Sequence, residues 1–389
     1  MLSKIHKNTL DLISIILSRS IYAFNWYNIS PLLLMISISL GIQLSILGLV
    51  PAFFLLGAGI FQIPAGLVSA KIGPKKTAMA GMYILSIFTI LSGFSWNLYS
   101  ILFFRFMIGA GAAFYFSPAI GILKNLFSEG RRGFSMGIYN AAFNLGAGLS
   151  VAITGIIANV VGWRWALILS GVIGLAITIE NHLTLPDNKQ ERVMNYSIVL
   201  LNRNIIFLGL ALAGFWGTYF ATAQLLDTYL IKERGFSSVI SGYVSSLILF
   251  TGIIGGPLGG HLLDRFGRGK LLLTLMAIFS ALIISTIPFQ SQYEIVISII
   301  LLGLFAVGIF SILYAIPSLY KEIPDNMIPL SIGLINSIQI SVGSIAPFAF
   351  TFISDKFSYF AGWFFLGVFV IIFLPLLLLI KTREAYRNV

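Results

Sequence analysis

Long apolar stretches separated by short polar turns run through the whole sequence. Each is about 20 residues or more, the length of helix that crosses a bilayer core of about 30 Å. The stretches lack the alternation of apolar and polar residues found in membrane barrels, so helices are the expected spans. The pattern predicts twelve helices, at 10–36, 42–70, 75–95, 97–125, 134–160, 164–184, 204–231, 238–264, 270–289, 292–320, 328–354 and 359–381.

One sizeable polar segment, 186–203, interrupts this series after the sixth helix. We expect it to be a cytoplasmic linker between an N-terminal six-helix bundle, residues 1–185, and a C-terminal six-helix bundle, residues 204–389. The predicted fold class is therefore an all-α integral membrane protein of twelve transmembrane helices in two pseudo-symmetric bundles.

Composition excludes an ordinary soluble domain, because 58% of the residues are hydrophobic and only 10% are charged. The net charge of +11 is distributed unevenly between the predicted loops. Eighteen lysines and arginines lie in loops on the side of the termini and four on the opposite side. The positive-inside rule therefore predicts cytoplasmic termini in a multi-pass protein of the plasma or inner membrane. The lipid bilayer explains the basic charge, so nucleic acid is not an expected partner.

A glycine-bounded basic turn occurs once in each predicted bundle. At an offset of 194 residues, the first copy (Gly66, Lys71, Gly73 and Lys76) maps onto the second (Gly260, Arg265, Gly267 and Lys270). Prolines recur as well, Pro64 with Pro257 and Pro118 with Pro317. Tandem repeats of this kind are typical of transporters whose substrate site lies between the halves.

These turns resemble the loop motif of the major facilitator superfamily, Gly-x-x-x-Asp-Arg/Lys-x-Gly-Arg/Lys-Arg/Lys. The second copy fits through Gly260, Asp264, Arg265, Gly267 and Arg268, whereas the first has Ala70 in place of the acid. The fourth span also carries Arg105-x-x-x-Gly109-x-Gly111, similar to an element of that family. The resemblance covers essentially the whole chain. It implies transport by alternating access, with the motif residues gating the cytoplasmic side in the outward-open state: Gly66, Lys71, Gly73, Gly260, Asp264, Arg265, Gly267 and Arg268.

The fifth span departs from the glycine and proline pattern of drug/proton antiporters in this superfamily. Gly137 and Gly146 have the expected spacing, but Ser150-Val151 replaces Gly-Pro and Thr154-Gly155 replaces Gly-Gly. This departure weakens an antiporter interpretation.

Arg19 interrupts the first span at a depth of roughly 14 Å, from nine residues at a helical rise of about 1.5 Å. Tyr22 and Trp26 follow at helical spacing on the same face. Arg105 lies at comparable depth in the fourth span. Because no acid of the first half lies at that depth, an anionic substrate is a natural partner for guanidinium groups. The alternative is that each arginine bonds backbone carbonyls or polar neighbours, and for Arg105 the family resemblance implies a mechanistic role linked to proton coupling.

Polar amides recur on related parts of the fifth and eleventh spans. They are Asn140, Asn144, Asn336 and Gln339. They could line a substrate cavity or make interhelical hydrogen bonds, and the sequence favours neither.

Proton coupling needs a titratable group in the pathway, and Asp227 is the candidate. With Gln224 it could form an outer gate or coupling site near the outer end of the seventh span, although a solvated helix end is the simpler expectation.

The sequence thus predicts a secondary active or facilitative transporter of a small solute, preferably a small organic anion, with a possible co-transported proton or ion. It carries no phosphate-binding loop or catalytic triad pattern, so we expect no enzymatic activity, no cofactor and no metal. An exporter of hydrophobic compounds and a non-transporting sensor or scaffold are the alternatives. We expect a monomer.

Overall fold

The fold follows from the apolar runs, which can bury their backbone polar groups in a membrane only as helices. The computed structural model describes residues 2–126, 132–187, 196–320, 322–324 and 327–380, and within them the chain is helical with no strand. The part of the linker at 188–195 and the last residues, 381–389, lie outside the described residues.

The described residues of the first half form seven α-helices and a 3-10 turn. They are α1 (Leu2–Tyr27), η1 (Ser30–Leu32), α2 (Leu33–Leu40), α3 (Leu44–Leu47), α4 (Leu49–Ile72), α5 (Pro74–Ser92), α6 (Leu98–Leu126) and α7 (Arg132–Thr184). The α7 segment is two spans, because Gly162 adopts φ +84° and breaks the helix.

The described chain resumes with a short helix inside the 186–203 linker and continues through the second half. The elements from there on are α8 (Ser197–Leu200), α9 (Arg203–Ala211), α10 (Ala213–Arg234), α11 (Ser238–Phe250), α12 (Gly252–Phe266), α13 (Gly269–Thr286), η3 (Ile287–Phe289), α14 (Gln292–Ala315), η4 (Ile316–Leu319), α15 (Ile328–Gly343), α16 (Ile345–Lys356), α17 (Tyr359–Phe373) and η6 (Leu374–Leu379).

The predicted twelve spans are confirmed. Ten segments of the described chain are long and apolar enough to cross a membrane, and one of them, Ile138–Thr184, contains the two spans joined at Gly162. The remaining span is α5, which follows the basic turn. Several spans are built from two consecutive helices, such as α9 with α10 and α15 with α16.

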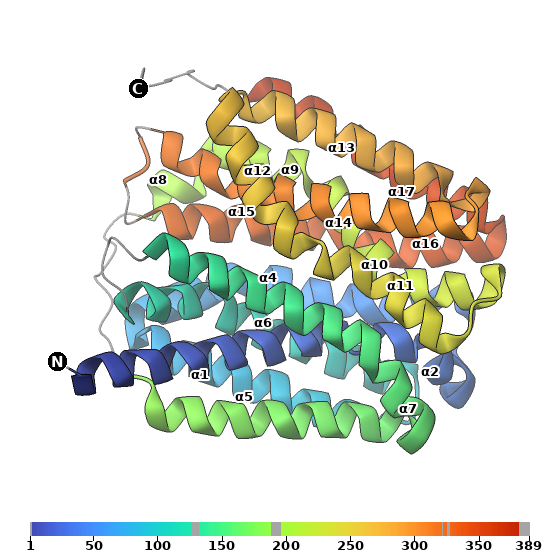
Figure 1. Cartoon of the computed structure of the whole chain (residues 1–389), viewed down its shortest axis with the longest axis horizontal. Helices are drawn as coiled ribbons and strands as arrows, with labels where there is room; N and C mark the ends of the chain where they lie inside the picture. The colour runs from blue at the N-terminus through green and yellow to red at the C-terminus, as the bar shows by residue number, and fades with distance from the viewer. Residues whose placement is uncertain (1, 127–131, 188–195, 321, 325–326, 381–389) are drawn as a thin grey trace.

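The two halves lie side by side, with the N-terminal helices (blue to green) in the lower part of Figure 1 and the C-terminal helices (yellow to red) in the upper part. Both chain ends lie at the left of this view. We call this the terminal end of the molecule and the opposite side the far end. Across the halves α7 packs on α11 and α4 on α15.

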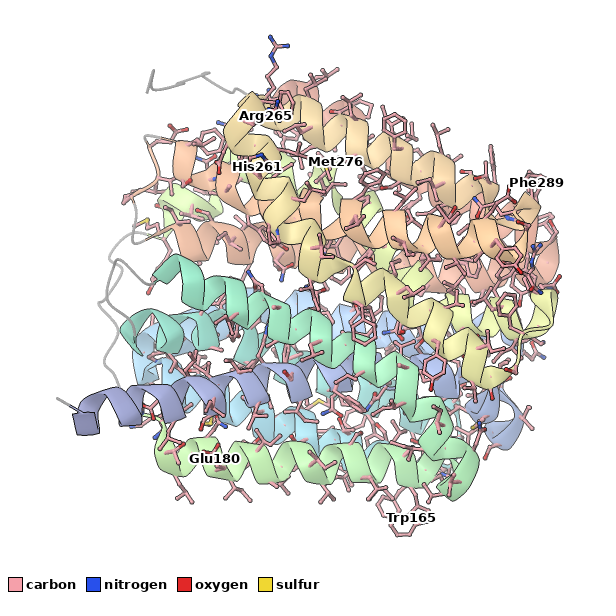
Figure 2. All side chains as sticks on the ribbon, in the orientation of Figure 1. Trp165, Glu180, His261, Arg265, Met276 and Phe289 are labelled. Carbon is pink, nitrogen blue, oxygen red and sulfur yellow. The ribbon has the colours of Figure 1, made fainter. Side chains whose placement is uncertain are left out.

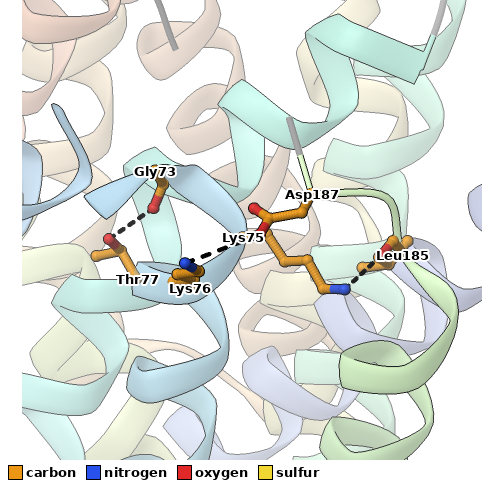
Figure 3. Close-up of polar contacts among 6 residues, drawn as sticks. All are labelled: Gly73, Lys75, Lys76, Thr77, Leu185 and Asp187. Atoms are coloured by element: carbon orange, nitrogen blue, oxygen red, sulfur yellow. Dashed lines mark hydrogen bonds and ion pairs between the residues drawn. The ribbon is translucent and has the colours of Figure 1, made fainter. Parts of the chain in front are cut away.

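The two basic turns form the same clamp at the terminal end. Lys75 donates a hydrogen bond to the carbonyl of Leu185, just after the last helix of the first half, and Lys270 donates to the carbonyl of Ile380, at the corresponding place in the second (Figure 3 shows the first). Lys76 instead approaches Asp187 at 4.0 Å. A cation at a helix C-terminus satisfies carbonyls that have no helical partner.

This geometry corrects the sequence alignment of the turns. An offset of 194 pairs Lys76 with Lys270, whereas the structure gives Lys75 and Lys270 the same role. The cause is one additional residue between the turn glycine and the next helix in the second copy, where α13 begins at Gly269. Both turn glycines, Gly73 and Gly267, do correspond, and both adopt positive φ.

Candidate functional site

The Arg19 side chain on α1 is enclosed by aromatic rings from three helices. Its Cζ atom lies 4.5 Å from the ring centre of Tyr139, 4.6 Å from Phe143, 5.0 Å from Tyr22 and 5.3 Å from Phe116. We call Arg19 and these four rings the arginine box. Ring faces attract a cation but do not satisfy its N–H groups.

Donors in the arginine box lack acceptors of ordinary hydrogen-bond geometry among the described residues, and the hydroxyls of Tyr22 and Tyr139 make only weaker polar contacts with Arg19. The Nε and Nη1 atoms of Arg19 are buried and have no hydrogen-bond partner of ordinary geometry in the described part of the chain. The same holds for the hydroxyls of Tyr22, Tyr139 and the neighbouring Tyr115. A buried charge without a polar partner is costly in a membrane, and N–H and O–H donors around one point suit an oxyanion.

The second half contributes Tyr314 on α14, which is close enough to Arg19 for the two groups to interact electrostatically. The Tyr314 hydroxyl donates to Oδ1 of Asn336 on α15 at 3.0 Å. One turn along α15, Gln339 is fully buried and neither atom of its amide has a partner among the described residues. The structure therefore brings Arg19 and Asn336, predicted from opposite halves, into one neighbourhood.

Tyr22 and Trp26 continue the arginine box along α1, as their spacing predicts. Their ring centres lie 5.6 Å apart, and Trp26 also makes an edge contact with Phe54 of α4 at 4.7 Å. Trp216 and Phe220 of α10 face Trp26 from the other half, at 6.5 and 6.3 Å. An aromatic cluster thus joins the two halves beside the box.

Arg105 on α6 lies behind this cluster. Its Nη2 atom donates to the carbonyl of Trp26 at 3.4 Å, and its Cζ lies 4.7 Å from the ring centre of Phe54. Nε and Nη1 have no partner within the described residues. This contact agrees with the alternative expected from the sequence, in which Arg105 bonds a backbone carbonyl. It also connects Arg105 to α1, the helix that carries Arg19.

The two asparagines of the fifth span lie apart from the arginine box. Asn140 is exposed, whereas Asn144 is buried, donates to the carbonyl of Asn140 and lies against Gly252 of the other half. The adjacent face of α7, with Tyr139 and Phe143, contacts Arg19 instead. Sequence reasoning missed these two aromatics, because Asn140 and Asn144 have the same spacing of four residues on the neighbouring face.

Cross-half hydrogen bonds hold the far end closed beyond the aromatic cluster. The side-chain amide of Gln224 on α10 donates to the carbonyl of Trp26 at 3.0 Å, and Ser30 donates to the carbonyl of Gln224 at 2.9 Å. Thr351 of α16 donates to the carbonyl of Ser45 at 3.1 Å. We call these contacts the far gate.

Asp227 lies one turn beyond Gln224 and is not a solvated helix end, because it is only 2% exposed. The Ser241 hydroxyl on α11 donates to its carboxyl group. The expectation that Asp227 lies at a solvent-exposed helix end was therefore wrong. The error has a physical cause: α10 continues to Arg234, a full turn and more beyond Asp227, and its far-end residues pack against α11.

In this conformation the predicted gating residues, whose latch was expected in the outward-open state, form no described link between the halves at the terminal end. A Cβ atom added at Gly66 or Gly260 would meet no atom within 4 Å. Lys71, Asp264, Arg265 and Arg268 are exposed, and no ion pair to Asp264 is formed among the described residues. Arg265 lies at the edge of the C-terminal half, remote from the N-terminal helices (Figure 2).

The distribution of contacts defines one conformational state. The far end is closed by the far gate, and the basic turns at the terminal end make no described contact with the opposite half. The arginine box of the first half and the Tyr314–Asn336 pair of the second half lie between these two ends.

A family model described as Major Facilitator Superfamily matches residues 15–347 of the chain. The protein therefore belongs to the major facilitator superfamily and is a membrane transporter that works by alternating access.

Particular relatives agree with this assignment. One probable galactarate/D-glucarate transporter of Escherichia coli (strain K12) is 25% identical over 355 aligned residues, and the match covers 79% of this chain and 80% of that protein. The probable sulfoacetate transporter of Cupriavidus necator is 24% identical over 361 residues, covering 85% and 83%. The crystal structure of a bacterial homologue of the human lysosomal transporter Spinster, inward-facing and unoccupied, has a TM-score of 0.77 at 14% identity and covers 96% of this chain and 97% of that one.

Proposed function

We propose that the protein transports a small organic anion whose negative group binds Arg19. The observation that carries this proposal is the buried Arg19 guanidinium, which interacts electrostatically with Tyr314 of the other half and has two donor atoms without a partner of ordinary geometry among the described residues. A carboxylate or sulfonate would accept from the guanidinium and from the tyrosine hydroxyls of the box, and charge-assisted bonds of this kind are the strong ones.

The names of two relatives support the choice of an anion. Galactarate, D-glucarate and sulfoacetate all carry negatively charged oxygen groups, which is the chemistry that the arginine box suits. Tyr314 and Asn336 would contact the rest of the anion from the second half.

We also propose that the terminal end faces the cytoplasm, in agreement with the excess of lysine and arginine in its loops. The conformation described is then inward-facing. Residues 1–185 and 204–389 would act as the two moving bundles, with 186–203 as the linker, and one copy of the chain contains both walls of the site.

A co-transported proton would have Asp227 as its carrier. Its carboxyl group is buried next to the far gate and accepts from a single described hydroxyl, that of Ser241. Opening the gate would expose the carboxyl group to the outside, which links its protonation to the conformational change.

The test is a thermal-unfolding screen of the purified protein with galactarate, glucarate, sulfoacetate, a neutral sugar and a lipophilic cation. We expect stabilisation by at least one anion and none by the neutral sugar. Stabilisation by lipophilic cations alone would contradict the anion proposal and favour export of hydrophobic compounds.

A further inference from the structure

A pocket lies at the far end, and no residue of the arginine box lines it. Its volume is about 330 Å³, and both halves line it. The first half supplies Leu44 and Leu47 of α3, and the second supplies residues of α10, α16 and α17. We call it the far-end pocket.

The polar groups of this pocket have a net negative charge. Glu233 and Asp355 line it and both lie within electrostatic range of Tyr359, whereas Lys232 is the one cationic side chain among the lining residues. The nearby Arg234 is already occupied, because it donates to the carbonyls of Pro288 and Gln290 at the end of the ninth span.

A buried hydroxyl in the wall has no hydrogen-bond partner among the described residues. Thr228 is 5% exposed, lines the pocket, and its Oγ1 makes no hydrogen bond to a described residue. Ser354 also lines the pocket, and its Oγ atom is likewise buried without a hydrogen-bond partner among the described residues. A hydroxyl oxygen accepts hydrogen bonds, so together with two carboxylates and the lining residue Tyr359 it suits a donor-rich cation.

We propose that the far-end pocket binds a small primary amine and that this ligand holds the far gate closed. An ammonium group has three N–H donors and a positive charge, which match the carboxylates of Glu233 and Asp355, the hydroxyl acceptors and the aromatic ring. The volume of about 330 Å³ corresponds to about ten waters at about 30 Å³ each, which is room for a small amine together with several waters.

The pocket exists in full only while the far end is closed. Leu44 and Leu47 reach it because Thr351 donates to the Ser45 carbonyl and accepts from the Gly48 N–H at 3.1 Å. Opening the far gate would move α3 away from α16 and remove one wall. A ligand that binds one state more tightly shifts the equilibrium toward it, so the amine would inhibit transport without competing for Arg19.

The experiment measures thermal unfolding of the full-length protein with ethanolamine, with neutral ethylene glycol as the size-matched control. We expect ethanolamine to stabilise the wild type and to lower its initial rate of substrate uptake, and ethylene glycol to do neither. The double variant Glu233→Gln/Asp355→Asn should need about tenfold more ethanolamine for the same effect, because charge-assisted hydrogen bonds are lost. Glu294→Gln, which changes an exposed acid outside the pocket, should respond like the wild type.

Two further variants test whether the ethanolamine effect comes from the far-end pocket. Thr228→Val should weaken the ethanolamine response, and it tests the pocket if the double variant fails to fold. Arg19→Ala should keep the full thermal stabilisation by ethanolamine, which separates this site from the proposed anion site. Equal stabilisation of the wild type and the pocket variants, or no stabilisation of the wild type, would overturn the proposal and leave the anion proposal untouched.

Discussion

The side-chain amide of Gln224 donates a 3.0 Å hydrogen bond to the main-chain carbonyl of Trp26, linking α10 of one half to α1 of the other. The same carbonyl accepts from Arg105 at 3.4 Å. Trp26 packs on Tyr22, which belongs to the arginine box. One carbonyl therefore connects the proposed anion site to the far gate, and a ligand that shifts α1 at Arg19 would alter the gate through it.

We expect Gln224→Ala to favour opening of the far end. The variant loses a cross-half hydrogen bond of about 1 kcal/mol net, which would shift the two-state equilibrium about fivefold. The chain has no cysteine, so a single Leu47→Cys substitution provides a specific label at a buried far-end position. The measurement is its rate of reaction with a membrane-impermeant maleimide.

Thr218→Ala is the matched control on the same helix. Thr218 donates to the carbonyl of Leu366 within the second half, so this variant loses a hydrogen bond without affecting the gate. Equal labelling of the two variants would show that the Gln224–Trp26 contact does not hold the far end closed.

Lys75→Ala should lower the stability of the first half. It removes the clamp on the Leu185 carbonyl, a contact worth about 1 kcal/mol, and leaves the end of the sixth span uncapped. Lys270→Ala should act likewise in the second half. Lys71→Ala, at an exposed position of the same turn, is the control in a thermal-unfolding measurement, and a drop as large as that of Lys75→Ala would contradict the clamp.

Asp264→Asn should reduce transport severalfold without loss of expression. Asp264 is exposed in the described state, so its proposed latch acts only when the terminal end closes. We therefore expect unchanged thermal stability and slower substrate uptake at matched protein levels. Uptake at the wild-type rate would exclude a gating role.

Asp227→Asn separates proton coupling from structural support. Asparagine keeps the shape and can still accept from Ser241, but it carries no exchangeable acid proton. Proton-driven accumulation should be lost, whereas exchange of labelled for unlabelled substrate should continue. Accumulation driven by a pH gradient in this variant would remove Asp227 from the coupling path.

The twelve spans were predictable because each must be apolar along its whole length. The face shared by Arg19, Tyr22 and Trp26 was predictable too, because helical spacing alone sets it. Contacts between helices could not be predicted from the sequence, because they depend on how each helix is rotated about its axis in the fold. Tyr139 faces Arg19 while its neighbour Asn140 is exposed, and no periodicity in α7 distinguishes the two.

Loop geometry limited the prediction at the basic turns. The single extra residue before Gly269 changes which lysine reaches the helix end, so Lys75 rather than Lys76 corresponds to Lys270. Burial of Asp227 depends on where α10 ends and on its packing against α11, which local sequence does not specify. Both errors arose where tertiary contacts decide the outcome.

The most direct test is anion binding by the wild type and by Arg19→Gln, measured by calorimetry with an anion that stabilises the protein. Glutamine keeps a polar side chain but removes the charge, so we predict a loss of affinity of about tenfold to hundredfold, as for one charge-assisted hydrogen-bonded pair. Lys71→Gln, which removes an exposed positive charge, should bind like the wild type. Anion binding by Arg19→Gln with wild-type affinity would contradict the account.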